Sequence, residues 1–139
     1  IEEVIRETNS TPCTSEFSGN LLLNVGINEL WKLVCGGTAT AYGSNALLWV
    51  GDSPATEDPT QTGLQGTNQL SKGMDEGYPV FGSDQKAKWR ATFLGTEANF
   101  VWNEFSVSNG SVHLNRKVSY QGTKVEGQTW VLTLEIVLS

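Results

Sequence analysis

The chain has 139 residues, with 15 acidic and 9 basic side chains and a formal net charge of −6 at pH 7. A chain of this length can form one domain with a substantial hydrophobic core. The charge balance argues against a nucleic-acid-binding groove, which needs clustered lysine and arginine. No stretch approaches about 20 consecutive apolar residues, so the sequence predicts no membrane-spanning helix.

The first 20 residues are polar and contain Pro12 and several serines and threonines. We expect an extended N-terminal arm over 1–20, which either stays unattached or orders on a neighbouring subunit. Cys13 lies in this arm and Cys35 lies beyond it. The alternatives for these cysteines are one disulfide bond or two free thiols.

One helix is predicted, over residues 21–35, and Gly36-Gly37 supplies its end. We expect its apolar side to pack on the core; this side carries Leu22, Ile27, Leu30, Trp31 and Val34. A short apolar run over 46–50 then predicts a buried strand.

A long polar segment over 51–66 follows that strand and contains Asp52, Glu57 and Asp58. Loops of this length in compact domains are often functional, so we expect a functional role for it. The spacing of its carboxylates does not match an EF-hand calcium loop, and no metal site is predicted.

The C-terminal third has the most regular pattern. Residues 86–94 alternate, which predicts a half-buried strand with a cationic solvent side, and residues 129–138 alternate in the same way. Asn109-Gly110 predicts a type I′ hairpin turn between two β-rich runs. The sequence therefore predicts a mainly β fold: an antiparallel sandwich or jelly-roll-like single domain over 21–139, with a C-terminal β-meander over about 86–138.

The predicted two-residue turn fixes the strand register. It pairs Phe105 with Leu114 and Asn103 with Arg116 on one apolar face, so Asn103 and Arg116 are predicted to be buried polar groups. Burial of Arg116 requires a carboxylate or backbone carbonyls nearby. The opposite face displays Phe100 and Trp102, which we expect to be covered by the 21–35 helix or by another subunit.

Catalytic signals are weak. His113 is the single histidine, and no nucleophile motif, phosphate-binding loop or paired-cysteine zinc spacing occurs. The carboxylates of Glu97, Glu104 and Glu135 are not selected as a hydrolytic pair by any pattern. The residues therefore select no catalytic site and no cofactor. A carbohydrate-binding or hydrolytic module that uses Trp102 for sugar stacking, with nearby carboxylates, is the alternative from another class.

Several motifs together resemble a group of small structural proteins from the virions of tailed bacteriophages. The resemblance runs from about residue 21 to the end, and the arm over 1–20 falls outside it. Its motifs are NALLWVGDSPATEDPTQTGLQG (45–66), GMDEGYP (73–79), ANFVWNEFSVSNG (98–110), LNRKV (114–118), GTK (122–124) and TWVLTLEIVL (129–138).

This resemblance implies a non-enzymatic, β-rich virion component without catalytic residues. The favoured expectation is a capsid decoration (cement) protein that binds the assembled head as a small homo-oligomer, with the major capsid protein as partner. A tail or head–tail junction component is the alternative location in the virion. The arm and the 51–66 segment, with Asp52, Glu57 and Asp58, are the expected contact regions.

Overall fold

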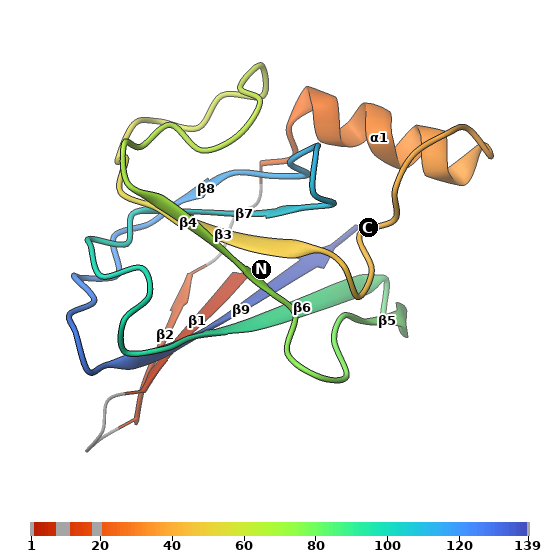
Figure 1. The fold of residues 1–139 in the computed structure, drawn as a ribbon. Helices are drawn as coiled ribbons and strands as arrows, with labels where there is room; N and C mark the ends of the chain where they lie inside the picture. The colour runs from red at the N-terminus through yellow and green to blue at the C-terminus, as the bar shows by residue number, and fades with distance from the viewer. Residues whose placement is uncertain (1, 8–11, 18–20, 139) are drawn as a thin grey trace.

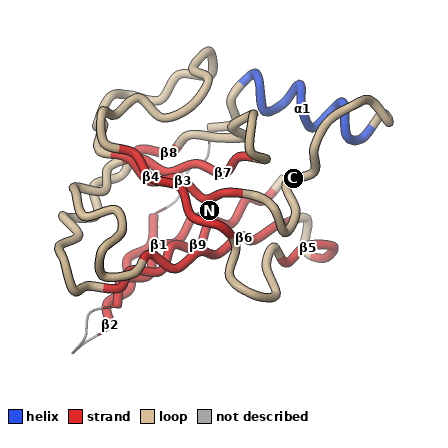
Figure 2. Tube along the Cα trace, in the orientation of Figure 1, coloured by secondary structure: helices blue, strands red, loops and turns tan. Residues whose placement is uncertain are grey.

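The chain forms two antiparallel β-sheets that face each other, with one helix at the end of the pair (Figures 1 and 2). The computed structural model describes residues 2–7, 12–17 and 21–138, and the side chains of residues 21–138. One sheet has the strand order β2-β1-β9-β6-β5 and the other has the order β4-β3-β7-β8. The elements are β1 (Glu2–Glu7), β2 (Pro12–Phe17), α1 (Asn24–Val34), β3 (Leu47–Gly51), β4 (Gln69–Gly73), β5 (Val80–Ser83), β6 (Lys86–Phe93), β7 (Glu104–Ser108), β8 (Lys117–Val118) and β9 (Thr129–Val137).

The core lies between the two sheets, as expected for a sandwich. Its centre is an aromatic cluster in which the fully buried Trp102 ring lies 5.1 Å from Phe93, 6.1 Å from Phe105 and 4.9 Å from Trp130, measured between centroids. All three pairs have the edge-to-face geometry that aromatic quadrupoles favour. The aliphatic part of the core comes from alternate residues of the central strands: Leu48, Val50, Val107, Leu132, Leu134 and Ile136.

The mainly β sandwich predicted from the sequence is confirmed. The predicted helix is α1, the predicted strand over 46–50 is β3, and the alternating runs become β6 and β9. In β6 the buried residues Trp89, Ala91 and Phe93 alternate with the partly exposed residues Lys88, Arg90 and Thr92, as the period of two requires.

The approach of α1 to the body of the protein depends on Gly26. A Cβ atom at this position would lie 2.6 Å from the Cα atom of Leu114, closer than a real side chain can approach. Just before the helix, the Leu23 amide donates to the Leu114 carbonyl at 3.0 Å. The glycine that weakens the helical propensity is therefore what allows the helix to rest on the backbone.

The prediction of a C-terminal β-meander over about 86–138 is wrong. β9 pairs with β1 and β6 in the five-stranded sheet, whereas β7 and β8 belong to the four-stranded sheet. The backbone at residues 115–116, which the predicted meander would pair with another of its strands, pairs with residues 21–22 instead. Leu22 forms a bridge with Asn115, and the Arg116 amide donates to the Leu21 carbonyl at 3.1 Å. The last strand crosses to the other layer instead.

The predicted register of the β7–β8 hairpin is also wrong. Ser108 bridges His113 and Phe105 pairs with Lys117, and only Gly110 of the Asn109-Gly110 pair has a positive φ. The Asn109 side chain explains the difference. Its Oδ1 accepts from the Val112 amide at 2.8 Å, and its Nδ2 donates to Glu29 Oε2 on α1 at 2.9 Å, so a contact with the helix sets the turn.

The N-terminal region is part of the sandwich in its described residues. β1 pairs with β2, and it pairs with β9 along its whole length, from Glu2 opposite Leu134 to Glu7 opposite Thr129. This corrects the expectation of an arm separate from the domain. Cys35 is a free and exposed thiol, so the disulfide alternative is wrong; the Cys13 side chain lies outside the described side chains.

Candidate interaction surface

The candidate interaction surface is the β3–β4 loop, residues 52–68. It connects two neighbouring strands of the four-stranded sheet and arches over the outer face of that sheet (Figure 1). β7 lies beneath it and is buried on both faces, with Phe105 and Val107 in the core and Glu104, Ser106 and Ser108 on the other side. The loop therefore replaces solvent over a polar strand face.

Glu104 anchors this loop from below. Its side chain is fully buried, and its two carboxylate oxygens accept from three loop amides: Ser53 at 3.0 Å, Gln65 at 2.8 Å and Gly66 at 2.8 Å. A carboxylate that accepts several backbone N–H groups is a strong, charge-assisted anchor. One side chain thus holds both ends of the loop, residues 53 and 65–66, to the same point.

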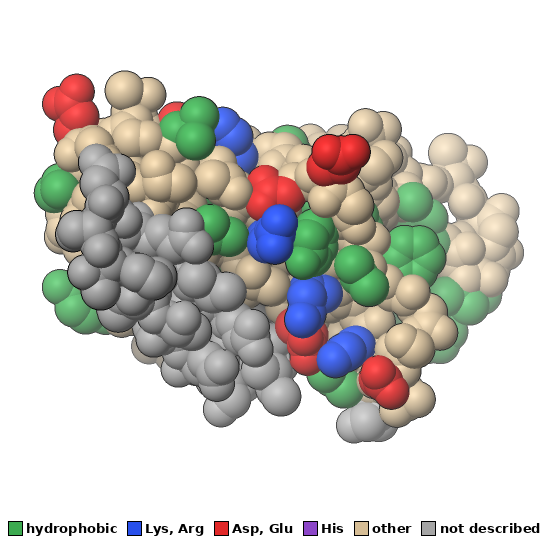
Figure 3. All heavy atoms as spheres, turned by 90° about the horizontal axis from the view of Figure 1, so that it is seen from below, with side chains coloured by type: hydrophobic (Ala, Val, Ile, Leu, Met, Phe, Trp, Pro, Cys, Tyr) green, Lys and Arg blue, Asp and Glu red, His purple; other side chains and the backbone are tan. Residues whose placement is uncertain are grey.

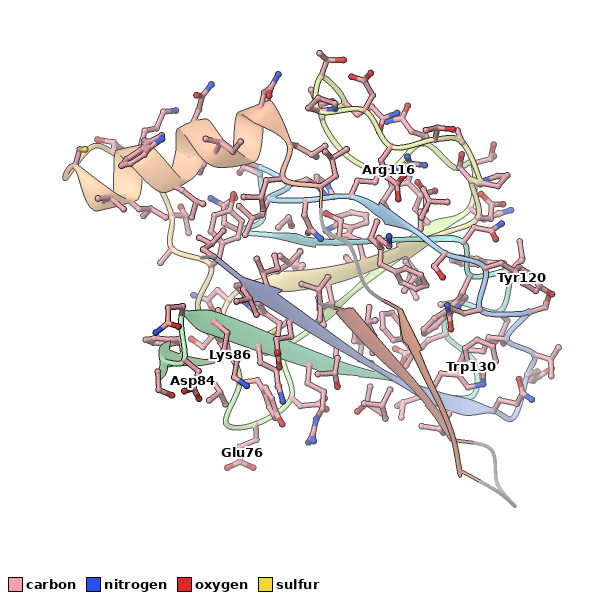
Figure 4. The ribbon with its side chains drawn as sticks, turned by 180° about the vertical axis from the view of Figure 1, so that it is seen from behind. Glu76, Asp84, Lys86, Arg116, Tyr120 and Trp130 are labelled. Atoms are coloured by element: carbon pink, nitrogen blue, oxygen red, sulfur yellow. The ribbon has the colours of Figure 1, made fainter. Side chains whose placement is uncertain are left out.

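Arg116 completes the anchor. Its Nε donates to Glu104 Oε1 at 3.0 Å, and its Nη1 donates to the Ala55 carbonyl at 2.9 Å and to Gln61 Oε1 at 3.2 Å. The Arg116 and Glu104 side chains are both 0% exposed. The sequence required a carboxylate or carbonyls beside Arg116, and the structure supplies both. Arg116 lies beneath the loop in Figure 4.

The predicted contact residues in the loop have distinct positions. Asp52 is half-buried and accepts from the Asn68 side chain at 2.7 Å, which joins the two ends of the loop, and Asn103 Nδ2 donates to the Asp52 carbonyl at 2.8 Å. Glu57 is also half-buried and accepts from the Val118 amide at 2.6 Å. Asp58 is exposed.

The crest of the loop is both ordered and exposed. The Thr60 amide donates to Asp58 Oδ1 at 2.8 Å, and the Thr60 hydroxyl and amide lower the pKa of the Asp58 carboxyl below its ordinary value. The aspartate is therefore held in its charged form. The exposed residues of the crest are Pro54, Ala55, Thr56, Asp58, Pro59 and Thr60.

The two aromatic residues predicted at an interface are not on this surface. Trp102 is 0% exposed at the centre of the core, and Phe100 is partly buried against the core. The predicted exposure of Phe100 and Trp102 is wrong because both residues precede β7, and the alternation of that strand does not extend to them. Val101 instead bridges Thr123, and the Trp102 amide donates to the Gly122 carbonyl at 2.9 Å.

The outer face of the β7–β8 hairpin contains one hydrogen-bonded serine–histidine pair. Ser106 Oγ lies 2.7 Å from His113 Nδ1, and the His113 ring packs on Trp49 at 5.2 Å. Ser106 is fully buried, so its hydroxyl cannot meet a substrate. Burial lowers the pKa of His113, because the charged imidazolium is desolvated, and the nearby Glu104 charge opposes this shift.

The other carboxylates that the sequence highlighted lie in separate ion pairs. Glu97 lies 2.6 Å from Lys72, while Glu135 lies 3.4 Å from Lys88 and 3.7 Å from Lys86. Acidic and basic side chains lie next to one another on the outer face of the five-stranded sheet (Figure 3). The cationic side of β6 is therefore partly neutralised by acidic neighbours.

No protein-family model, curated protein or solved structure matches this chain. Among the described residues there is no group of three or more histidine, cysteine, aspartate or glutamate side chains placed to hold a metal ion. In the same residues, no helix has the length and apolar character needed to cross a membrane.

Proposed function

We propose that this chain is a non-enzymatic structural protein of a bacteriophage virion and that it decorates the assembled head. The observation that carries the proposal is the β3–β4 loop: an exposed crest is held rigid by a buried ion pair that belongs to the core of the fold. The proposed partner is the major capsid protein, and the chain acts as a small homo-oligomer.

The rigidity of this loop is the property that a binding surface needs. A surface segment that is already ordered loses little conformational entropy when it binds, so more of the contact energy appears as affinity. A protein that binds only the assembled shell then stabilises that shell by mass action, in proportion to the logarithm of its concentration over its dissociation constant. No chemical step is required.

The sequence resemblance supports the same function. Its 45–66 motif contains most of the β3–β4 loop, and its 98–110 and 114–118 motifs contain the two anchoring side chains, Glu104 and Arg116. The features that carry the resemblance and those that build the surface are therefore largely the same. A tail or head–tail junction component would use the same surface at another position in the virion. The carbohydrate-binding alternative depended on an exposed Trp102 and is not retained, since Trp102 is fully buried.

A pair of charge-matched variants tests the surface. Asp58→Lys changes the crest of the β3–β4 loop, whereas Glu76→Lys makes the same change of charge at an exposed residue on the opposite side of the molecule (Figure 4). Purified chain is incubated with particles that lack it, and bound protein is measured after sedimentation. We expect Asp58→Lys to weaken binding at least about tenfold and Glu76→Lys to bind as the wild type does.

Two results would refute the proposal. If the wild-type chain does not sediment with assembled particles, decoration is wrong. If both variants lose binding equally, the effect comes from net charge and the loop is not the contact surface. Binding to isolated tails but not to heads would move the protein to the alternative position.

A further inference from the structure

A pocket of about 450 Å³ opens between α1 and the end of the five-stranded sheet that carries the β5–β6 turn. Its walls are mostly apolar and include Leu30 of α1, Trp89 of β6 and Ile136 of β9. Two aromatic residues of the wall use their polar groups internally: Trp89 Nε1 donates to the Tyr42 carbonyl at 2.9 Å, and Tyr42 Oη donates to the Val112 carbonyl at 2.9 Å. The interior thus suits an apolar group.

The mouth of this pocket carries an acidic group. The β5–β6 turn contributes Asp84, an exposed residue with a φ of 57° that makes no hydrogen bond or ion pair with the described residues. Lys86 also lines the pocket but lies 3.7 Å from Glu135. Figure 4 shows Asp84 and Lys86 near each other below α1, at the same end of the molecule. A ligand with an apolar part and an adjacent cation would complement this site.

The exposed side of α1 presents such a group. Ile27, Trp31 and Val34 are spaced so that they share one side of the helix, and they are 36%, 62% and 73% exposed. This stripe adjoins Leu30, which lines the pocket. Lys32 follows the tryptophan directly; its side chain is 57% exposed and lies 3.4 Å from Glu29. The chain therefore carries an exposed indole next to a cation.

We propose that the pocket receives the Trp31 side chain of a second copy of this chain, with Lys32 of that copy beside Asp84. An indole is smaller than the molecules that pockets of about 300–1,000 Å³ hold. Because each copy has one α1 stripe and one pocket at the same end of the molecule, a twofold axis lets both contacts form at once and closes the assembly as a dimer. Tryptophan is also the residue type most enriched at the energetic centres of interfaces.

This inference deepens the proposed function by naming the contact between copies in the homo-oligomer. It is tested on free protein in solution, without particles. If the chain fails to bind particles, the contact between copies is therefore unaffected. If the chain fails to associate with itself, decoration by monomers is still decided by the particle-binding experiment. Other occupants of the pocket, such as a segment of a different protein, predict no association of the pure chain.

The test is sedimentation equilibrium of the wild type and three variants. Trp31→Ala removes the inserted group, and Ala87→Leu fills the pocket from its wall. Tyr120→Ala is the control, since Tyr120 is 71% exposed and lies at the other end of the molecule (Figure 4). We expect wild type and Tyr120→Ala to form dimers at about 100 μM, and the other two variants to dissociate at least about a hundredfold more readily, because a twofold dimer loses two contacts.

A charge exchange adds specificity to the test. Lys32→Glu should weaken the dimer by placing two carboxylates together, and a second change, Asp84→Lys, should restore it. Far-UV circular dichroism confirms that each variant is folded. A wild-type chain that remains monomeric at about 100 μM overturns the proposal. The same holds if Trp31→Ala associates as tightly as the wild type, or if Asp84→Lys fails to restore association.

Discussion

Replacing Glu104 by glutamine is the most informative change in the β3–β4 loop anchor. The substitution keeps the shape of the side chain and removes its charge. The two carboxylate oxygens face four donors: Oε2 accepts from the amides of residues 53 and 66, and Oε1 accepts from the amide of residue 65 and from Arg116 Nε. The amide of glutamine has only one oxygen, so its NH2 group faces two donors in either orientation.

The expected cost follows from these contacts. Hydrogen bonds to a charged group contribute about 1.5–3 kcal/mol each, so losing two of them costs about 3–6 kcal/mol. Measured losses on breaking a buried ion pair are about 3–5 kcal/mol, because the remaining charge stays buried. Both estimates agree on a destabilisation of about 3–5 kcal/mol, which is a large part of the stability of a small domain.

Urea denaturation of the wild type, Glu104→Gln and a control measures this cost. The control is Lys88→Gln, which removes a partly exposed ion pair with Glu135 and should cost no more than about 1 kcal/mol. A double variant, Glu104→Met with Arg116→Met, should remain destabilised, because the loop amides still lack their acceptor. If Glu104→Gln lies within about 1 kcal/mol of the wild type, the anchor does not act as described.

Three further changes test other parts of the structure by urea denaturation. Gly26→Ala, favourable for a free helix, should destabilise the protein because its Cβ would collide with the Leu114 backbone; a more stable variant would contradict the packing of α1. Trp102→Ala should cost about 3–5 kcal/mol, since the side chain is fully buried; a loss below about 1 kcal/mol would contradict its position. Burial lowers the folded-state pKa of His113, so the unfolded chain binds the proton more tightly and stability should fall as the pH drops below about 6.5; His113→Gln should lose that part of the pH dependence, and an unchanged profile would contradict the effect.

Much of the secondary structure follows from local pattern. β6 and β9 are predicted correctly as strands because strict alternation over eight or more residues indicates an extended chain without any tertiary information. The expected burial of one face only holds for β6, whereas in β9 Thr133 and Glu135 on the other face are buried too. The helix was also predicted, although the solvent exposure of Trp31 was not. An apolar residue at helical spacing indicates an apolar side, but the pattern does not indicate whether that side meets the core.

The register and the anchor could not be predicted, for a different reason. The Asn109-Gly110 pair favours a two-residue turn in isolation, yet Asn109 binds Glu29 of a helix that lies far away in the sequence. The burial of Arg116 was predicted, while the identity of its partner was not, because the predicted register placed Glu104 on the opposite face. Residues distant in sequence decide both points, and a short-range rule contains no information about them.

The most direct test of the proposed function is a density map of the purified virion that contains this chain. We expect density for the chain on the outer surface of the head, with the β3–β4 loop facing the major capsid protein and with neighbouring copies in contact through α1. Absence of the chain from the particle would contradict the proposed function. Its presence on the head with the β3–β4 loop facing solvent would contradict the role assigned to that loop.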